Sequence, residues 1–163
     1  MGHRALLAGM GLMLCMPAAA ADMPDWPVAR AQDIIQAVSE CSATSGDAER
    51  LAQWGWAVGS ADPITGAGMT QFRRPGLNAR LGLPDLAGSR TRCWVLAQTR
   101  DHEDGLVAAL SAAWGAPTHR GRRQALWRRD GQVLVLDWFA PKSVPVALRV
   151  EVVTDSGAGR TNP

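Results

Sequence analysis

The chain has 163 residues, of which 47% are hydrophobic and 20% are charged, and its formal net charge is +2. This length fits one domain, and the composition is that of an ordinary globular protein. A nearly balanced charge gives no general attraction to nucleic acid or to an anionic membrane, so we expect no nucleic-acid partner.

The first 21 residues have the pattern of an export signal. A positive start at Arg4 precedes an apolar run over residues 5–16, Pro17 interrupts the run, and four alanines lead to Asp22. This pattern is typical of a signal that is removed on maturation, and the run is too short to persist as a membrane-spanning helix. We therefore expect cleavage after Ala21 and a mature protein without a transmembrane segment. Its expected location is the periplasm of a Gram-negative bacterium or the extracellular medium.

Two helices are predicted at the start of the mature chain. Pro27 suits a first helical turn, and apolar residues then recur at steps of three and four as far as Cys41, which predicts an amphipathic helix. Ser45 or Asp47 can cap a second, shorter helix. Gly55 suits the position that follows this helix.

The next part of the chain is predicted to hold two strands, Met69–Arg73 and Thr91–Thr99. The segment between them, Arg74–Arg90, contains two prolines, three glycines and several leucines but no clear periodicity. A connector of this length is typically functional or disordered, and its leucines argue against disorder. We expect it to be a functional segment.

One disulfide is predicted between Cys41 and Cys93. Cys41 lies on the apolar stripe of the first helix, and Cys93 shares a strand face with Val95 and Ala97, the face expected to pack on that helix. Two cysteines in an oxidising compartment suggest one disulfide. The alternative is a pair of buried free thiols.

A third helix is predicted to start at an Asp101 cap and to end at Gly115. The strands Arg122–Arg129 and Gln132–Phe139 follow, joined by Asp130-Gly131, which is a strong signal for a tight hairpin. A last strand is expected over residues 146–153, followed by a flexible tail over residues 154–163.

These elements predict a single α+β domain over residues 22–153. Its antiparallel sheet has about five strands, two or three helices pack mainly on one face, and the order is ααββαβββ. Residues 114–117 read Trp-Gly-Ala-Pro and precede a strand that contains Trp127. This helix end and strand resemble small envelope proteins of the outer-membrane assembly lipoprotein and β-lactamase-inhibitor type. The mature chain lacks the lipid-bearing cysteine of the lipoproteins, so we transfer no function.

The strand Gln132–Phe139 is apolar on both faces except at Asp137, which is typical of a strand covered on both sides. We expect the segment Arg74–Arg90 or a second copy of the protein to cover the second face. Asp137 is expected to pair with Arg128 or Arg149 across the sheet.

The densest group of metal-ligand types is residues 101–104, Asp-His-Glu-Asp. Neighbouring residues at a helix start point in different directions, and acidic residues there offset the helix dipole, so we expect no metal and no cofactor. The chain lacks the common hydrolase, redox and phosphate-binding motifs. Only His102 and His119 remain in the mature chain to activate a nucleophile.

We therefore expect a small exported, non-enzymatic protein that binds another protein or an envelope component, with a second copy as one candidate partner. The expected contact surfaces are the leucine-bearing segment and the arginine-rich approach to the hairpin, with residues Leu77, Leu81, Leu83, Leu86, Arg120, Arg122 and Arg123. One alternative is an envelope hydrolase whose site is assembled only in the fold. Another is a protein that binds an anionic ligand through its arginines.

Overall fold

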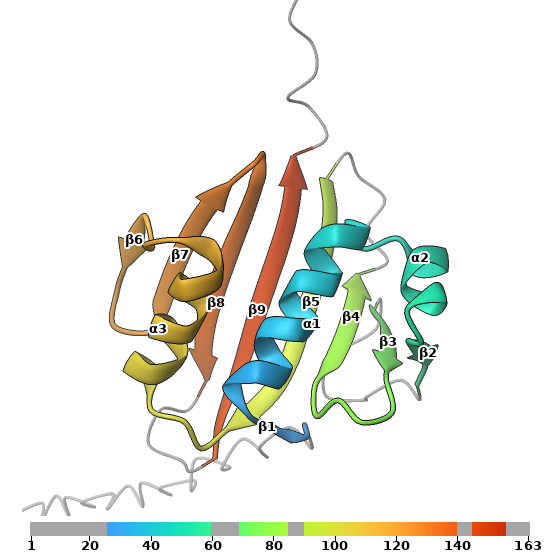
Figure 1. Cartoon of the computed structure of the whole chain (residues 1–163), viewed down its shortest axis with the longest axis horizontal. Coiled ribbons are helices and arrows are strands. Elements are labelled where there is room, and N and C mark those ends of the chain that lie inside the picture. The colour runs from blue at the N-terminus through green and yellow to red at the C-terminus, as the bar shows by residue number, and fades with distance from the viewer. Residues whose placement is uncertain (1–25, 60–68, 85–89, 140–144, 156–163) are drawn as a thin grey trace, which may run out of the picture.

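The computed structural model describes residues 26–59, 69–84, 90–139 and 145–155. In this part of the chain, nine strands form one sheet in the order β2-β3-β4-β5-β9-β8-β7-β6, with β1 paired to β5. Figure 1 shows the sheet with the helices in front of it. The elements are β1 (Val28–Ala29), α1 (Ala31–Thr44), α2 (Ala48–Gln53), β2 (Ala57–Val58), β3 (Met69–Arg73), β4 (Arg80–Pro84), β5 (Arg90–Thr99), α3 (Glu103–Trp114), β6 (His119–Arg120), β7 (Gln124–Arg129), β8 (Gln132–Phe139) and β9 (Val146–Asp155).

The prediction of mixed helices and an antiparallel sheet is confirmed, but the strand count and the order are wrong. All the pairings along the sheet are antiparallel, and only β1 pairs in parallel. The described part of the chain has nine strands where we expected about five. Three of the extra strands, β1, β2 and β6, have two residues each, too few for an alternating pattern to be visible.

The fourth extra strand, β4, lies inside the segment that we expected to be irregular. Gly82 pairs with Gln71 of β3 and Trp94 of β5, and a Cβ atom at Gly82 would collide with the Sδ of Met69. A glycine within a strand often marks such a close approach. The sequence shows Gly82 but does not show that Met69 packs against it, so the sequence alone favours a loop.

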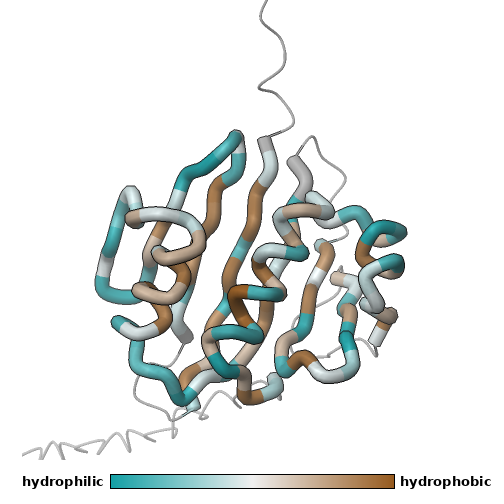
Figure 2. The backbone as a smooth tube through the Cα atoms, viewed as in Figure 1, coloured by the Kyte–Doolittle hydropathy of each residue, from teal (hydrophilic) through white to brown (hydrophobic). Residues whose placement is uncertain are grey.

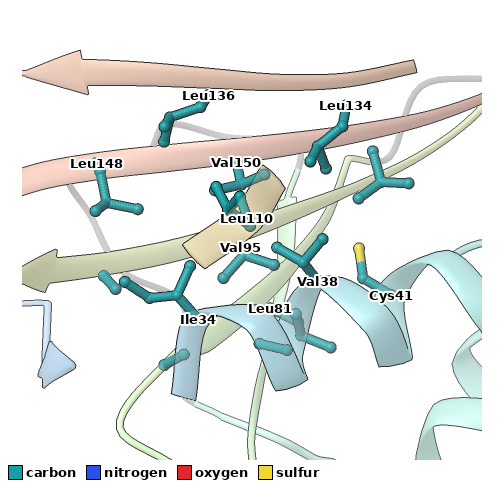
Figure 3. Packing of buried hydrophobic residues seen from close by; sticks show 14 of the residues in the cluster. Ile34, Val38, Cys41, Leu81, Val95, Leu110, Leu134, Leu136, Leu148 and Val150 are labelled. Atoms are coloured by element: carbon teal, nitrogen blue, oxygen red, sulfur yellow. The ribbon is translucent and has the colours of Figure 1, made fainter. Parts of the chain in front are cut away.

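The main core lies between the sheet and the two longer helices. α1 and α3 lie side by side on one face (Figure 1), over strands whose central parts are strongly hydrophobic (Figure 2). Ile34 and Val38 of α1 and Leu110 of α3 are fully buried there (Figure 3). Each such side chain stabilises the fold by roughly 1.5–3 kcal/mol. The labelled strand residues that they meet are Leu81, Val95, Leu134, Leu136, Leu148 and Val150.

Cys41 and Cys93 form a disulfide with Cα atoms 5.9 Å apart. Both residues are buried in the main core, where the bond connects α1 to β5. The predicted pairing is thus present, and it follows from the two faces on which the cysteines were placed.

Pro27 does not start the first helix, because α1 begins at Ala31 and the intervening Val28–Ala29 forms β1 beside the end of β5. The carboxylate of Asp101 accepts a hydrogen bond of 2.9 Å from the backbone N–H of Ala31. Asp101 therefore caps α1 and not α3, whose N-cap residue is His102.

The helix-free face of the sheet carries a smaller apolar cluster, in which Trp26 packs with Met69, Leu96 and Ala147. Strand β4, in the described part of the segment Arg74–Arg90, does not cover β8 on this face, because β5 and β9 lie between the two strands. Residues 85–89 lie outside the described residues, so coverage of β8 by them or by a second copy of the protein stays a prediction. Val135 of β8 is half-buried on this face.

Arg149 provides the predicted charge pair on the helix-free face. Its guanidinium lies 2.8 Å from a carboxylate oxygen of Asp137 and 5.0 Å from the ring centroid of Trp94. Of the two partners expected for Asp137, the structure uses Arg149 rather than Arg128. The pairing joins β8 to β9 and is the kind of cross-strand contact that stabilises a sheet.

The sheet has the same plan in its two halves. In each half a glycine with a φ of 86°, Gly55 or Gly115, lies within two residues of the end of a helix, and a two-residue edge strand, two middle strands and a long central strand follow. The central strands β5 and β9 pair with each other over their whole length. The edge strands β2 and β6 therefore lie at opposite ends of the sheet.

The predicted export signal over residues 1–21 lies outside the described residues. At the other end, Thr154 and Asp155 still belong to β9, two residues into the segment expected as a tail. None of the helices in the described ranges is long and apolar enough to cross a membrane.

Candidate functional site

Two of the three most exposed large apolar side chains among the described residues lie beside the β2 edge of the sheet. Among the described residues, Val28, Trp54 and Val58 are 45%, 42% and 70% exposed. Trp54 and Val58 line two neighbouring clefts beside α2 and β2, whereas Val28 belongs to β1, which pairs with β5. Exposed apolar groups that cluster in this way mark a contact site more often than scattered ones do. We call this region the β2 corner.

The first cleft, the Glu40 cleft, has a volume of about 610 Å³ and opens to solvent. It lies where α1, the end of α2 and the turn after β3 meet. Its lining residues are Glu40, Gln53, Trp54, Gly55, Arg74 and Pro75.

Glu40 is the buried charge of this cleft, and three side chains donate hydrogen bonds to it. The indole Nε1 of Trp56 donates over 2.7 Å, the amide of Gln36 donates over 3.0 Å, and Arg74 forms an ion pair with the same carboxylate. Burial alone would raise the pKa of Glu40, but these hydrogen bonds and the charge of Arg74 outweigh burial and lower the pKa. Glu40 is therefore a charged group that the fold holds in place.

The local sequence builds this cleft through α2. Asp47 accepts hydrogen bonds from the N–H groups of Glu49 and Arg50. Of the two residues predicted to cap α2, Ser45 and Asp47, the structure uses Asp47. Gly55 then adopts a positive φ, which glycine tolerates without steric cost. The reversal sends Trp56 inward against Glu40 and leaves Trp54 in solvent.

The second cleft, the β2 groove, has a volume of about 430 Å³. It runs between β2, the last strand on this side of the sheet, and the turn that joins β3 to β4. It is rimmed by Arg73, Arg74 and Arg80, and it has no acidic residue among its lining residues in the described ranges. The other lining residues are Pro27, Ala57, Val58, Gly59, Pro75, Leu77 and Ala79.

The structure separates the leucines that we expected at one contact surface. Leu77 is half-buried and lines the β2 groove. Leu83 packs against the main core, where Leu81 is fully buried, so Leu81 takes no part in the surface of the single chain. Leu86 lies outside the described residues.

The expected arginines lie at the opposite edge of the sheet. Arg120 belongs to β6 and pairs with Asp104 of α3, and Arg122 and Arg123 are exposed in the following turn. Because β2 and β6 end the sheet on opposite sides, these arginines and Leu77 cannot contact one small partner segment together. The leucine-bearing segment and the arginines are therefore two separate regions, and a role in partner binding stays a prediction for each.

The residues considered for metal or acid–base chemistry are only partly brought together. Asp101, His102 and Glu103 line a pocket of about 270 Å³ with Thr99, and no serine is among its described lining residues. His119 lies on β6. The described ranges contain no group of three or more His, Cys, Asp or Glu residues arranged to hold a metal ion.

The β2 corner was not predicted from the sequence. Trp54 and Trp56 flank the same glycine, and only the turn at Gly55 decides which of them is exposed. The one available signal was the segment Arg74–Arg90, whose first residues do line both clefts.

Comparisons of the chain with family models, with curated proteins and with solved structures find no match. The class of protein that the fold defines is an α+β protein with a disulfide-linked core.

Proposed function

We propose that this protein is exported, has no catalytic role, and binds an acidic, partly apolar segment of another protein at the β2 corner. The observation that carries the proposal is the exposure of Trp54 and Val58 in two neighbouring clefts that arginines line. Interfaces combine an apolar centre with a polar rim and are enriched in Trp and Arg. The apolar centre with its polar rim, and the presence of Trp and Arg, support a binding surface for another protein.

Charge indicates the kind of partner. Arg73 is exposed, and among the described residues it has no charge partner, while the β2 groove contains no lining carboxylate to neutralise it. An acidic segment would offset this charge and would be favoured over a basic one. An extended conformation suits the site, because β2 ends the sheet and a further strand can pair beside such an edge.

The two alternative functions have less support. A hydrolase would need a nucleophile beside a base. In the pocket at His102 the hydroxyl group is that of Thr99, and its Oγ1 already accepts a hydrogen bond from the N–H of Asp101 over 3.1 Å. An anionic small ligand would need an enclosed cavity, whereas both clefts of the β2 corner open to solvent. Binding of an anionic group remains part of the proposal, because the proposed partner segment is acidic.

Site-specific photocrosslinking in the cells that produce the protein tests this proposal. A photoreactive residue at position 58 should form an adduct with a partner protein, and the crosslinked partner peptide should contain Asp or Glu. The same residue at position 108, which is exposed on α3, is the matched control and should give no such adduct. Absence of an adduct at position 58, or equal yields at both positions, would contradict the proposal.

A further inference from the structure

We infer that the Glu40 cleft is a carboxylate-binding subsite, in which Arg74 hydrogen-bonds a carboxylate of the bound segment beside Trp54. The inference rests on the proposed function, because it names the chemical group that the partner's segment presents there. An acidic side chain and a free chain end carry the same planar group with two acceptor oxygens. Both are candidate sources.

Arg74 is held in one orientation and keeps donors free. Its Nη1 contacts Glu40, and among the described residues its side chain has no other polar partner. The side chain is 31% exposed and lines the cleft. A guanidinium carries N–H groups in a rigid fork that matches a carboxylate, so the edge turned away from Glu40 is available to an anion.

Glu40 fixes Arg74 without filling the site itself. Its side chain is only 11% exposed, and its two oxygens are occupied by the donors of Trp56, Gln36 and Arg74. Trp56 and Gln36 donate from neutral groups, so Glu40 keeps its full charge and pairs with Arg74 through a single guanidinium nitrogen, Nη1. The remaining N–H groups of Arg74 can still donate hydrogen bonds to a second carboxylate.

Two neighbours of Arg74 leave room for that ligand. A Cβ atom on Gly55 would lie 3.9 Å from the Nε of Arg74, so the missing side chain keeps the approach open. Trp54 stands beside it with 42% of its surface exposed. Its indole can cover the apolar part of the residue that carries the carboxylate.

Three short peptides test the subsite by NMR titration of the mature protein labelled with ¹⁵N. Acetyl-Gly-Leu-Glu-Leu-Gly-amide offers a side-chain carboxylate, and acetyl-Gly-Leu-Gln-Leu-Gly with a free end offers a terminal one. Acetyl-Gly-Leu-Gln-Leu-Gly-amide is the neutral control. We expect one or both of the charged peptides to shift the Nε–H signals of Arg74 and Trp54, and the neutral peptide to bind at least about tenfold more weakly.

Variants locate the effect. Arg74→Gln should remove the preference for the charged peptides, whereas Arg50→Gln, which changes an exposed arginine on α2 outside both clefts, should keep it. Because Arg74→Gln leaves the charge of Glu40 without its arginine, the double variant E40Q/R74Q keeps a neutral pair in the same space. The double variant should fold and should also lose the preference.

Equal binding of the neutral and charged peptides, or an unchanged preference in E40Q/R74Q, would overturn the carboxylate subsite. Failure of the subsite differs from failure of the proposed function. A protein that crosslinks a partner at position 58 but has no carboxylate preference is a binding protein without this subsite. A protein with neither property contradicts both proposals.

Discussion

Trp56 donates its indole N–H to a carboxylate oxygen of Glu40 over 2.7 Å. The bond joins the residue after the α2 turn to the interior of α1, and both partners are buried. A buried carboxylate is stable only when donors replace its lost water, and Trp56 provides one that carries no charge. The β2 corner is thus assembled around a charged group that belongs to the core.

This relationship makes the stability of the fold sensitive to acid. The pKa of Glu40 is lowered in the folded protein, so its contribution is present above the ordinary pKa of about 4.3 and is lost as the pH falls through the lower folded value. Glu40→Gln should therefore reduce the free energy of unfolding by about 1–3 kcal/mol at neutral pH. The difference from the native protein should shrink below about pH 4.

Urea unfolding at several pH values measures this difference, and Glu49→Gln is the control because Glu49 is exposed on α2. The control should stay within about 0.5 kcal/mol of the native protein. A deficit in Glu40→Gln that is equally large at pH 7 and pH 3 would show that its cause is shape and not charge.

The disulfide should stabilise the fold measurably. Cys41 and Cys93 are 52 residues apart in sequence, and closing a loop of this length contributes at most about 4 kcal/mol in the chain-entropy model. The double replacement C41A/C93A should lower the free energy of unfolding by about 2–4 kcal/mol. Urea unfolding of the variant, compared with the native protein with and without reductant, should give the same loss for reduction and for replacement.

A structural feature of this molecule could be predicted from the sequence when residues close to it in the chain determine it. The hairpin at Asp130-Gly131 is correct because both residues adopt the positive φ that such a turn needs. The strand Met69–Arg73 is correct to the residue. The disulfide was predictable because each cysteine lies on a face that its own neighbours define.

The features that the sequence did not reveal depend on distant partners. Asp101 reads as the cap of the helix that follows it, yet it caps α1, 70 residues earlier. Gly82 reads as part of a loop until Met69 is placed over it. The candidate site was hidden for the same reason, since Glu40 and Arg74 meet only in the fold and exposure alone separates Trp54 from Trp56.

The export prediction can be tested by intact mass spectrometry. Protein isolated from the cell envelope or the medium should begin at Asp22, because the pattern over residues 1–21 is that of a cleaved signal. Its mass should also be lower by two hydrogens than that of the same chain with free thiols. A protein that keeps its first methionine and is found in the cytosol would contradict the proposed location.

The capping role of Asp101 predicts a stability effect on a helix that is remote in sequence. Asp101→Ala removes the acceptor for the N–H of Ala31 and should cost about 1 kcal/mol. Asp104→Ala is the matched control, because its exposed ion pair with Arg120 should contribute less than about 1 kcal/mol. Thermal unfolding followed by circular dichroism should rank the two variants in this order.

Substitutions at Leu81 and Leu77 distinguish a role in the core from a role in partner binding. Because it is fully buried against α1 and β5, Leu81→Ala should cost about 2–5 kcal/mol without changing the molar mass measured by light scattering. Leu77→Ala should destabilise less, because Leu77 is half-buried, but it should weaken crosslinking at position 58 because Leu77 lines the β2 groove. The opposite pattern, a stable Leu81→Ala protein whose mass falls by half, would place Leu81 at a contact between two copies instead.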